Sequence, residues 1–214
     1  MKTFMKNFLA VDTSCNHLSV VAVKDGKTYA TYIEDCAMRH AVSLMGAVDE
    51  TLQKANMQLS DCDFFAAVVG AGSFTGIRIG ISAMKGFALA TGKPTLAITS
   101  FDVAAYNAVD TGKKLALVNA LHDCYYACGY EEDATVYPPS YLTEEEVLCL
   151  IKQGFSAVSA EALPIAEKIE VKRVNPCEGL EKAARALAEK NAFGELTALY
   201  VRKSSAELNA EGKK

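Results

Sequence analysis

The sequence lacks a hydrophobic run long enough to cross a membrane. A membrane-spanning helix needs about 20 consecutive apolar residues, and no stretch of the 214 residues reaches that length. The first 14 residues contain lysines and then a short apolar run, but that run ends at Asp12 and no small-residue cleavage site follows it. We therefore expect a cytoplasmic protein without membrane contact, whose first element is a buried strand over residues 8–12.

The sequence also has no excess of basic residues. The net charge is −4, and it is uneven, with +1 over residues 1–100 and −5 over residues 101–214. Proteins that bind nucleic acids neutralise the phosphates with clustered Lys and Arg side chains. The chain is therefore not expected to bind RNA or DNA by itself.

Paired cysteine motifs are absent as well. The seven cysteines form no Cys-x-x-Cys pair, and most are scattered through predicted helices and strands. This usage is typical of reduced thiols that serve as small core residues. A catalytic cysteine is a minor alternative, since no histidine motif accompanies one. We expect no disulfide framework, metal or cofactor.

Hydrophobic periodicity predicts an α/β chain in which one order of elements occurs twice. The first copy has strands at 7–14, 63–72 and 95–100, a hairpin at 17–35, and helices at 39–56, 76–91 and 101–109. The second has strands at 114–122, 124–132, 134–139 and 155–159, and helices at 143–154 and 178–192. Expected caps are Ser100 for the helix at 101–109 and Thr143, with Glu146, for the helix at 143–154. Two lobes follow, 1–109 and a smaller, degenerate 110–214, with a tail returning toward the first lobe. No linker rich in Pro, Gly or Ser separates them, so we expect a shared interface.

Residues 69–88, VGAGSFTGIRIGISAMKGFA, begin like a phosphate-binding loop. The spacing of the glycines misses the P-loop, the dinucleotide fingerprint and the nucleophile elbow. Gly70 and Gly72 instead fit a strand-to-helix turn, and Ser73 or Thr75 would cap a helix that starts near Gly76. A structural turn is the favoured interpretation, but a helix N-terminus attracts anions, so contact with a phosphate stays open.

The helix predicted at 76–91 is apolar almost all round. One stripe contains Ile77, Ile81, Met84 and Ala88, and the opposite side contains Ile79, Ala83, Phe87 and Ala90. Gly76, Gly80 and Ala83 would form a smooth surface for close approach of another helix. A helix that is apolar on both sides is buried on both sides. If one side of this helix packs on the sheet, the other side is covered either by the helix at 39–56 or by a different protein. Periodicity leaves both possibilities open.

Three segments together resemble the bacterial TsaB family, also called YeaZ. They are FLAVDTS (8–14), the glycine stretch followed by TLAITS (95–100), and the tail ALYVRKSSAE (198–207). The resemblance implies a duplicated actin-like ATPase (ribonuclease H-like) fold. It also implies a non-catalytic subunit that pairs with TsaD, which makes threonylcarbamoyladenosine at position 37 of tRNA. The implied assembly includes the ATPase TsaE, a self-dimer when the chain is alone, and tRNA contact only through the complex.

The resemblance implies pairing through the helices of the first lobe. The expected interface residues are Ala41, Leu44, Met45, Val48, Ile77, Arg78, Ile81, Met84, Lys85 and Ala88. On this hypothesis Ile81→Asp or Met84→Asp would abolish pairing and leave the fold intact.

Several positions agree with a non-catalytic role. The family's metal-binding partner has paired histidines on its first long helix, whereas here that helix has only His40, expected to be solvated or to cap the helix. Asp12 is followed by TSCNHLS, which lacks the glycine of a phosphate-binding hairpin. The chain also departs from the family at Ala71, where proline is usual, and at 119–121, which read Asn-Ala-Leu and not Asp-Ala-Arg. An independent hydrolase and a free-standing ATPase remain the alternative functions.

Overall fold

The computed structural model describes residues 6–107, 112–132 and 134–202. In the first lobe, five strands form a mixed sheet in the order β3-β2-β1-β4-β5. These strands are β1 (Phe8–Asp12), β2 (Leu18–Lys24), β3 (Lys27–Ile33), β4 (Phe64–Val68) and β5 (Thr95–Ile98). β1, β2 and β3 pair antiparallel, while β4 runs parallel to both β1 and β5.

The second lobe repeats this topology. Its strands are β6 (Lys113–Asn119), β7 (Cys124–Glu131), β8 (Ala134–Thr143), β9 (Ser156–Ser159) and β10 (Val171–Arg173). Their order is β8-β7-β6-β9-β10, with the same antiparallel and parallel pairings as in the first sheet. The duplicated α/β fold expected from the order of elements is therefore confirmed, and the strand order of the second lobe is now defined.

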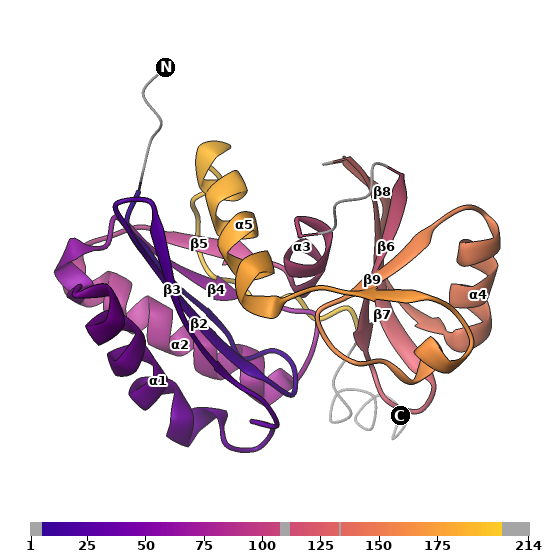
Figure 1. Cartoon of the computed structure of the whole chain (residues 1–214), viewed down its shortest axis with the longest axis horizontal. Coiled ribbons are helices and arrows are strands. Elements are labelled where there is room, and N and C mark those ends of the chain that lie inside the picture. The colour runs from indigo at the N-terminus through magenta and orange to yellow at the C-terminus, as the bar shows by residue number, and fades with distance from the viewer. Residues whose placement is uncertain (1–5, 108–111, 133, 203–214) are drawn as a thin grey trace, which may run out of the picture.

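The five α-helices of the described residues form three layers around the two sheets, as Figure 1 shows. They are α1 (His40–Ala55), α2 (Phe74–Thr91), α3 (Ser100–Ala105), α4 (Glu144–Lys152) and α5 (Pro176–Glu189). α1 and α2 cover one face of the first sheet, α3 and α5 lie between the sheets, and α4 covers the far face of the second sheet. Where the first lobe has α2, the second has only the single 3-10 turn Pro164–Glu167, which makes it the smaller lobe.

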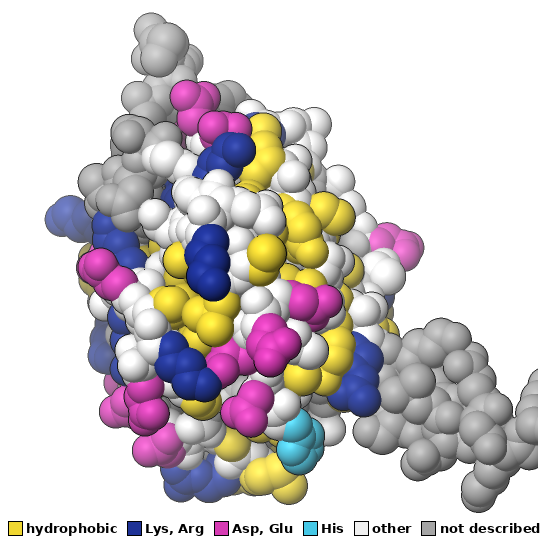
Figure 2. All heavy atoms as spheres, turned by 90° about the vertical axis from the view of Figure 1, so that its right-hand side faces the viewer, with side chains coloured by type: hydrophobic (Ala, Val, Ile, Leu, Met, Phe, Trp, Pro, Cys, Tyr) yellow, Lys and Arg dark blue, Asp and Glu magenta, His cyan; other side chains and the backbone are white. Residues whose placement is uncertain are grey.

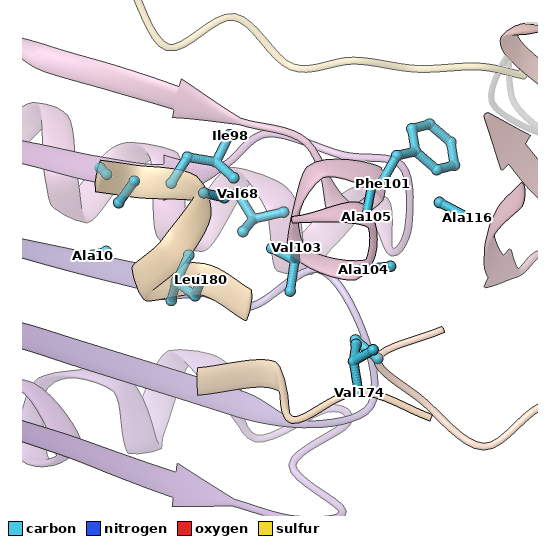
Figure 3. Close-up of a cluster of buried hydrophobic side chains, with 14 of the residues drawn as sticks. Ala10, Val68, Ile98, Phe101, Val103, Ala104, Ala105, Ala116, Val174 and Leu180 are labelled. Carbon is cyan, nitrogen blue, oxygen red and sulfur yellow. The ribbon is translucent and has the colours of Figure 1, made fainter. Parts of the chain in front are cut away.

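A continuous apolar core joins the two lobes. Figure 3 shows Val103 of α3 and Leu180 of α5 beside Val68 and Ile98 of the first sheet, with Ala116 of the second sheet at the other side of α3. All five side chains are fully or almost fully buried. The lobes therefore share one interface, as the missing linker suggested. The boundary expected at 109–110 lies outside the described residues.

Some elements differ from their expected bounds. α3 is capped by Thr99, whose Oγ1 accepts from the Asp102 N–H at 3.0 Å, and not by Ser100 as predicted. Ser100 lies inside the helix and donates to the Ala71 carbonyl. α5 begins at Pro176 because the Asn175 side chain accepts from two N–H groups of its first turn. Thr143 caps α4 as predicted, and the short strand β10 was not predicted.

The tail, residues 193–202, runs back over the first lobe and then reaches the second. The Leu199 N–H donates to the Val69 carbonyl at 2.7 Å. Three residues on, Arg202 donates to the hydroxyl of Tyr141 in β8 at 3.2 Å. Residues 203–207, the second half of the motif ALYVRKSSAE, lie outside the described residues.

The outer face of the second lobe has no single-sign charge. In Figure 2 acidic and basic side chains are interspersed there with small apolar areas. Within the described part of the chain, no helix combines the length and the apolar character that a membrane span requires.

Candidate functional site

A shallow apolar groove lies between α1 and α2 on the outside of the first lobe. Its volume is about 600 Å³. The residues that line it are Ala41, Leu44, Met45, Thr75, Arg78, Ile79, Ser82 and Ala83. Two further large apolar side chains of the same helices are exposed, Val42 at 86% and Leu89 at 87% of their maximum. The two helices thus keep an uncovered apolar surface after the first lobe has folded.

Five of the ten expected interface residues lie inside the first-lobe core, which corrects the prediction for all of them except Leu44, because Leu44 also lines the groove. They are Leu44, Val48, Ile77, Ile81 and Met84. The Ile77 and Met84 side chains have no exposed surface, and Ile81 has 8%. An aspartate at 81 or 84 would place a charge in the core and unfold the lobe, so neither substitution tests pairing.

The other five expected interface residues, Ala41, Met45, Arg78, Lys85 and Ala88, are wholly or partly exposed. Their contact with a partner stays a prediction. Sequence reasoning missed Val42 and Leu89, the most exposed apolar side chains of the two helices. The signal was available for Val42, which is four residues from Met38 and three from Met45, opposite the core stripe of its helix.

The glycines of α2 determine which side of the helix packs on the sheet. A Cβ at Gly76 would lie 2.0 Å from the Thr13 carbonyl oxygen, and one at Gly80 would lie 2.6 Å from Thr13 Oγ1. These glycines therefore allow α2 to approach the end of β1, and not another helix as expected. The side of α2 that contains them, with Ile77 and Met84, faces the sheet.

The loop before α2 is a structural turn. Gly70 and Gly72 have φ angles of 128° and 145°, which other residues rarely adopt. Ser73 caps α2, since its Oγ accepts from the Gly76 N–H at 3.2 Å, while Thr75 is exposed. The Ser73 N–H donates to the Ser14 carbonyl at 2.7 Å, so this amide is not free for a phosphate.

Asp12 ends β1 beneath this loop and is enclosed by protein groups. Its Oδ1 accepts from the Ser14 N–H at 2.8 Å and from the Ser14 hydroxyl at 2.7 Å, and its Oδ2 lies 3.5 Å from His17 Nε2. Burial is the largest influence on the pKa of Asp12 and raises it, but His17 and the two Ser14 bonds together leave that pKa lowered. The carboxylate is ionised and already occupied.

Neighbouring groups do not complete a catalytic set. Burial, followed by the charges of Glu161 and Asp12, raises the pKa of the Cys15 thiol well above its usual value, which disfavours the thiolate. His40 is buried, and its Nε2 bonds to the His17 carbonyl at 3.0 Å, so the solvated role expected for it was wrong. In the described ranges, no three His, Cys, Asp or Glu side chains come close enough to hold a metal ion.

A second hollow, the interlobe cleft, opens between the two lobes and has a volume of about 500 Å³. First-lobe residues lining it include Ser14, Cys15 and Asn16 of the turn after β1. Second-lobe residues include Asn119, which departs from the family pattern, and Glu161. The Glu161 Oε1 accepts from the Asn119 N–H at 2.8 Å. Burial is the main cause that raises the pKa of Glu161.

Two matched sheets with a shared helical layer and a cleft between them define a two-lobed α/β protein with the duplicated actin-like (ribonuclease H-like) fold. A family model for TsaD, tRNA N6-adenosine threonylcarbamoyltransferase, matches residues 32–140. The chain belongs to this family, and its relatives place it with the members named TsaB (YeaZ).

Two curated relatives and one solved structure give the extent of the similarity. TsaB of Buchnera aphidicola subsp. Schizaphis graminum, a tRNA threonylcarbamoyladenosine biosynthesis protein, is 31% identical over 114 residues, which are 53% of this chain and 54% of that protein. TsaB of Bacillus subtilis is 32% identical over 99 residues, 46% and 43% of the two chains. A Pseudomonas aeruginosa protein described as uncharacterized, with similarity to the peptidase YeaZ, has the same fold, with a TM-score of 0.74 at 23% identity over 92% of this chain and 100% of that one. The chain spans about half the length of the curated relatives it matches.

Proposed function

We propose that the chain is a non-catalytic subunit in the formation of threonylcarbamoyladenosine in tRNA, and that it pairs with a TsaD-type transferase through the exposed face of α1 and α2. The observation that carries this proposal is the uncovered apolar surface of these two helices in a chain whose relatives are named TsaB. The role places the protein in the cytoplasm.

The exposed face of α1 and α2 has the chemistry of a protein interface. Monomeric proteins seldom leave several large apolar side chains together in water. Met45 and Ile79 border the groove beside Arg78, so an apolar centre lies next to a guanidinium that can pair with an acidic residue. A partner with two similar helices would complete a four-helix contact, and a second copy of this chain would do the same when the transferase is absent.

The state of Asp12 and its surroundings supports a non-catalytic role. Asp12 is held by Ser14 and His17, and the Ser73 N–H that could hold a phosphate is bonded to Ser14. TsaE, as the ATPase of a ternary complex, and tRNA, bound only through that complex, complete the proposed assembly.

Met45→Asp, with Val136→Asp as its matched control, tests the surface. Both side chains are 44% exposed, but Met45 borders the groove and Val136 lies on β8 of the other lobe. We expect the Met45 variant to keep the wild-type melting temperature and to weaken binding to the TsaD-type protein by about thirtyfold, as for a hot spot of ~2 kcal/mol. Titration calorimetry measures the dissociation constant, and the Val136 variant should bind like the wild type.

Equal binding by both variants would rule out the α1/α2 face as the interface. The isolated protein should also be assayed for ATP turnover and for peptide cleavage. Turnover by the purified chain that disappears in Asp12→Asn would replace the scaffold role with an enzymatic one.

A further inference from the structure

The interlobe cleft differs in charge from a phosphate site. Among the described residues that line it, Glu161 is the one acidic side chain and none is Lys or Arg. Asp12 adds a second carboxylate behind the turn that carries Ser14. Burial leaves the pKa of Glu161 raised, although His17 and Arg173 lie near enough to lower it. A nucleoside triphosphate would still meet the Glu161 carboxylate directly, and the Ser73 amide is already bonded to Ser14.

The Glu161 carboxylate is held in a defined position at the cleft. Its Oε1 accepts from the Asn119 N–H at 2.8 Å, and the Glu161 N–H donates to the Ser159 hydroxyl at 3.2 Å. That hydroxyl in turn donates to the Leu117 carbonyl at 2.9 Å, which ties the segment to β6. A carboxylate fixed by the backbone does not have to be ordered when a ligand arrives, which favours binding.

The remaining lining is apolar with a few polar groups, His40 among them. The Tyr126 ring is half-buried at the cleft, while Met38 on the first lobe and Leu121 on the second are largely exposed at its edge. Asn16 adds an amide that can accept or donate a hydrogen bond. An aromatic ring near a carboxylate is the combination that binds organic cations.

We propose that the interlobe cleft binds a small organic cation, a primary amine with an apolar body, whose ammonium group pairs with Glu161 and whose body lies against Tyr126 and Met38. The volume of about 500 Å³ is in the range of small-molecule sites. The proposal is independent of pairing through α1 and α2.

Phenethylamine is the probe, tested against 2-phenylethanol, phenylacetate and Mg-ATP with the full-length chain. These compounds separate the charge from the shape, because the first three share one ring and differ in the group that would meet Glu161. Calorimetry or ligand-observed NMR should show the amine binding at least about tenfold more tightly than the alcohol, with phenylacetate and ATP weaker still. The gap is the size expected for one charge-assisted hydrogen bond.

Glu161→Gln should weaken phenethylamine binding by about tenfold, and Glu145→Gln, which changes an exposed acid on α4 of the same lobe, should not change it. Leu121→Trp, which narrows the cleft without changing its charge, should also weaken phenethylamine binding. This second variant tests the same site if Glu161→Gln unfolds. The proposal is overturned if no probe binds, if ATP or phenylacetate binds as well as the amine, or if amine binding survives both the Glu161 and the Leu121 substitutions.

Discussion

The carbonyl and hydroxyl oxygens of Thr13 determine how closely α2 approaches the first sheet. The Thr13 hydroxyl donates to the Gly76 carbonyl at 2.7 Å, and both Gly76 and Gly80 leave the space that Thr13 fills. A methyl group at either glycine would overlap this residue, and the Thr13 backbone cannot move without shifting β1.

Gly76→Ala and Gly86→Ala separate this contact from the ordinary effect of glycine in a helix. Both positions are inside α2, but a Cβ at Gly86 meets no atom within 4 Å. We expect Gly76→Ala to lower the free energy of unfolding by about 1–3 kcal/mol and Gly86→Ala to raise it by up to ~1 kcal/mol. Urea denaturation measures both. Similar shifts in the two variants would mean that α2 does not press on Thr13.

Asp12 gives the fold a defined dependence on pH. Its pKa in the folded protein is lowered from the ordinary value of 3.8, so Asp12 stabilises the fold above that value, and this stabilisation is lost as the pH falls through the folded pKa. Between pH ~5 and pH ~3, the free energy of unfolding should therefore fall more steeply for the wild type than for Asp12→Asn. Urea titrations at several pH values test this. Parallel slopes for the wild type and Asp12→Asn would contradict the assignment.

At the scale of elements, α2 is an apolar helix with two different faces. The face with Gly76, Ile77 and Met84 packs on the sheet, and the face with Arg78, Ser82 and Leu89 points outward. Hydrophobicity alone did not distinguish the two apolar stripes expected from the sequence, because both contain isoleucine and alanine. The small residues were decisive, since only the sheet-facing side needs them for a close contact with β1.

The tail is fixed to the start of α2 by an aromatic contact. The rings of Tyr200 and Phe74 are stacked, with centroids 4.2 Å apart, and Arg78 Nε donates to the Tyr200 hydroxyl at 2.8 Å. A Cβ at Gly70 would lie 2.3 Å from the Leu199 carbonyl oxygen, so the tail also covers the glycine loop.

Tyr200→Ala should therefore loosen both the tail and the loop beneath it. We expect a loss of about 1–2 kcal/mol in stability and faster amide exchange at Leu199, whose N–H bonds to Val69. Tyr200→Phe keeps the stacking and loses only an exposed hydrogen bond, so its loss should be smaller. Hydrogen exchange and urea denaturation measure these effects, and unchanged exchange in the alanine variant would show that the ring does not hold the tail.

At the scale of the whole molecule, each lobe contributes one helix that packs on the sheet of the other lobe. α5 follows the second sheet in the chain but packs on the first, while α3 follows the first sheet and packs on the second. The two helices also pack on each other, where a Cβ at Gly179 would lie 2.1 Å from the Val103 carbonyl. Displacing either α3 or α5 from the sheet on which it packs would therefore disturb the other lobe.

Leu180→Ala tests this coupling. Leu180 is fully buried in the core cluster that spans both lobes, and we expect the substitution to cost about 2–5 kcal/mol. Both sheets should lose protection together in hydrogen exchange, and calorimetry should show a single transition at a lower temperature. Leu89→Ala, at an exposed site on α2, should change the melting temperature little. Two separate transitions in the Leu180 variant would show that the lobes unfold independently.

The sequence by itself determined the order of the elements and most of their caps. Alternating and helical periodicity depend on each segment's own residues, and so do Ser73 before α2 and Thr143 before α4, because a cap bonds to N–H groups two or three residues away. β10 was missed because three residues are too few for a pattern. The glycine motif, together with FLAVDTS, TLAITS and the tail ALYVRKSSAE, indicated the family.

Only the tertiary structure decided which surfaces remain open. Ile77 and Met84 were expected to meet a partner, whereas Leu89 was not. Ile77 and Met84 are buried and Leu89 is exposed because the side of α2 that contains Gly76 and Gly80 packs closely against Thr13, which is distant in sequence. The sequence does not reveal the cleft either, since Ser14 and Glu161 line the same hollow only when the two sheets are held together by α3 and α5. Local sequence specifies an element and its apolar faces, but contacts between distant residues determine which face is covered.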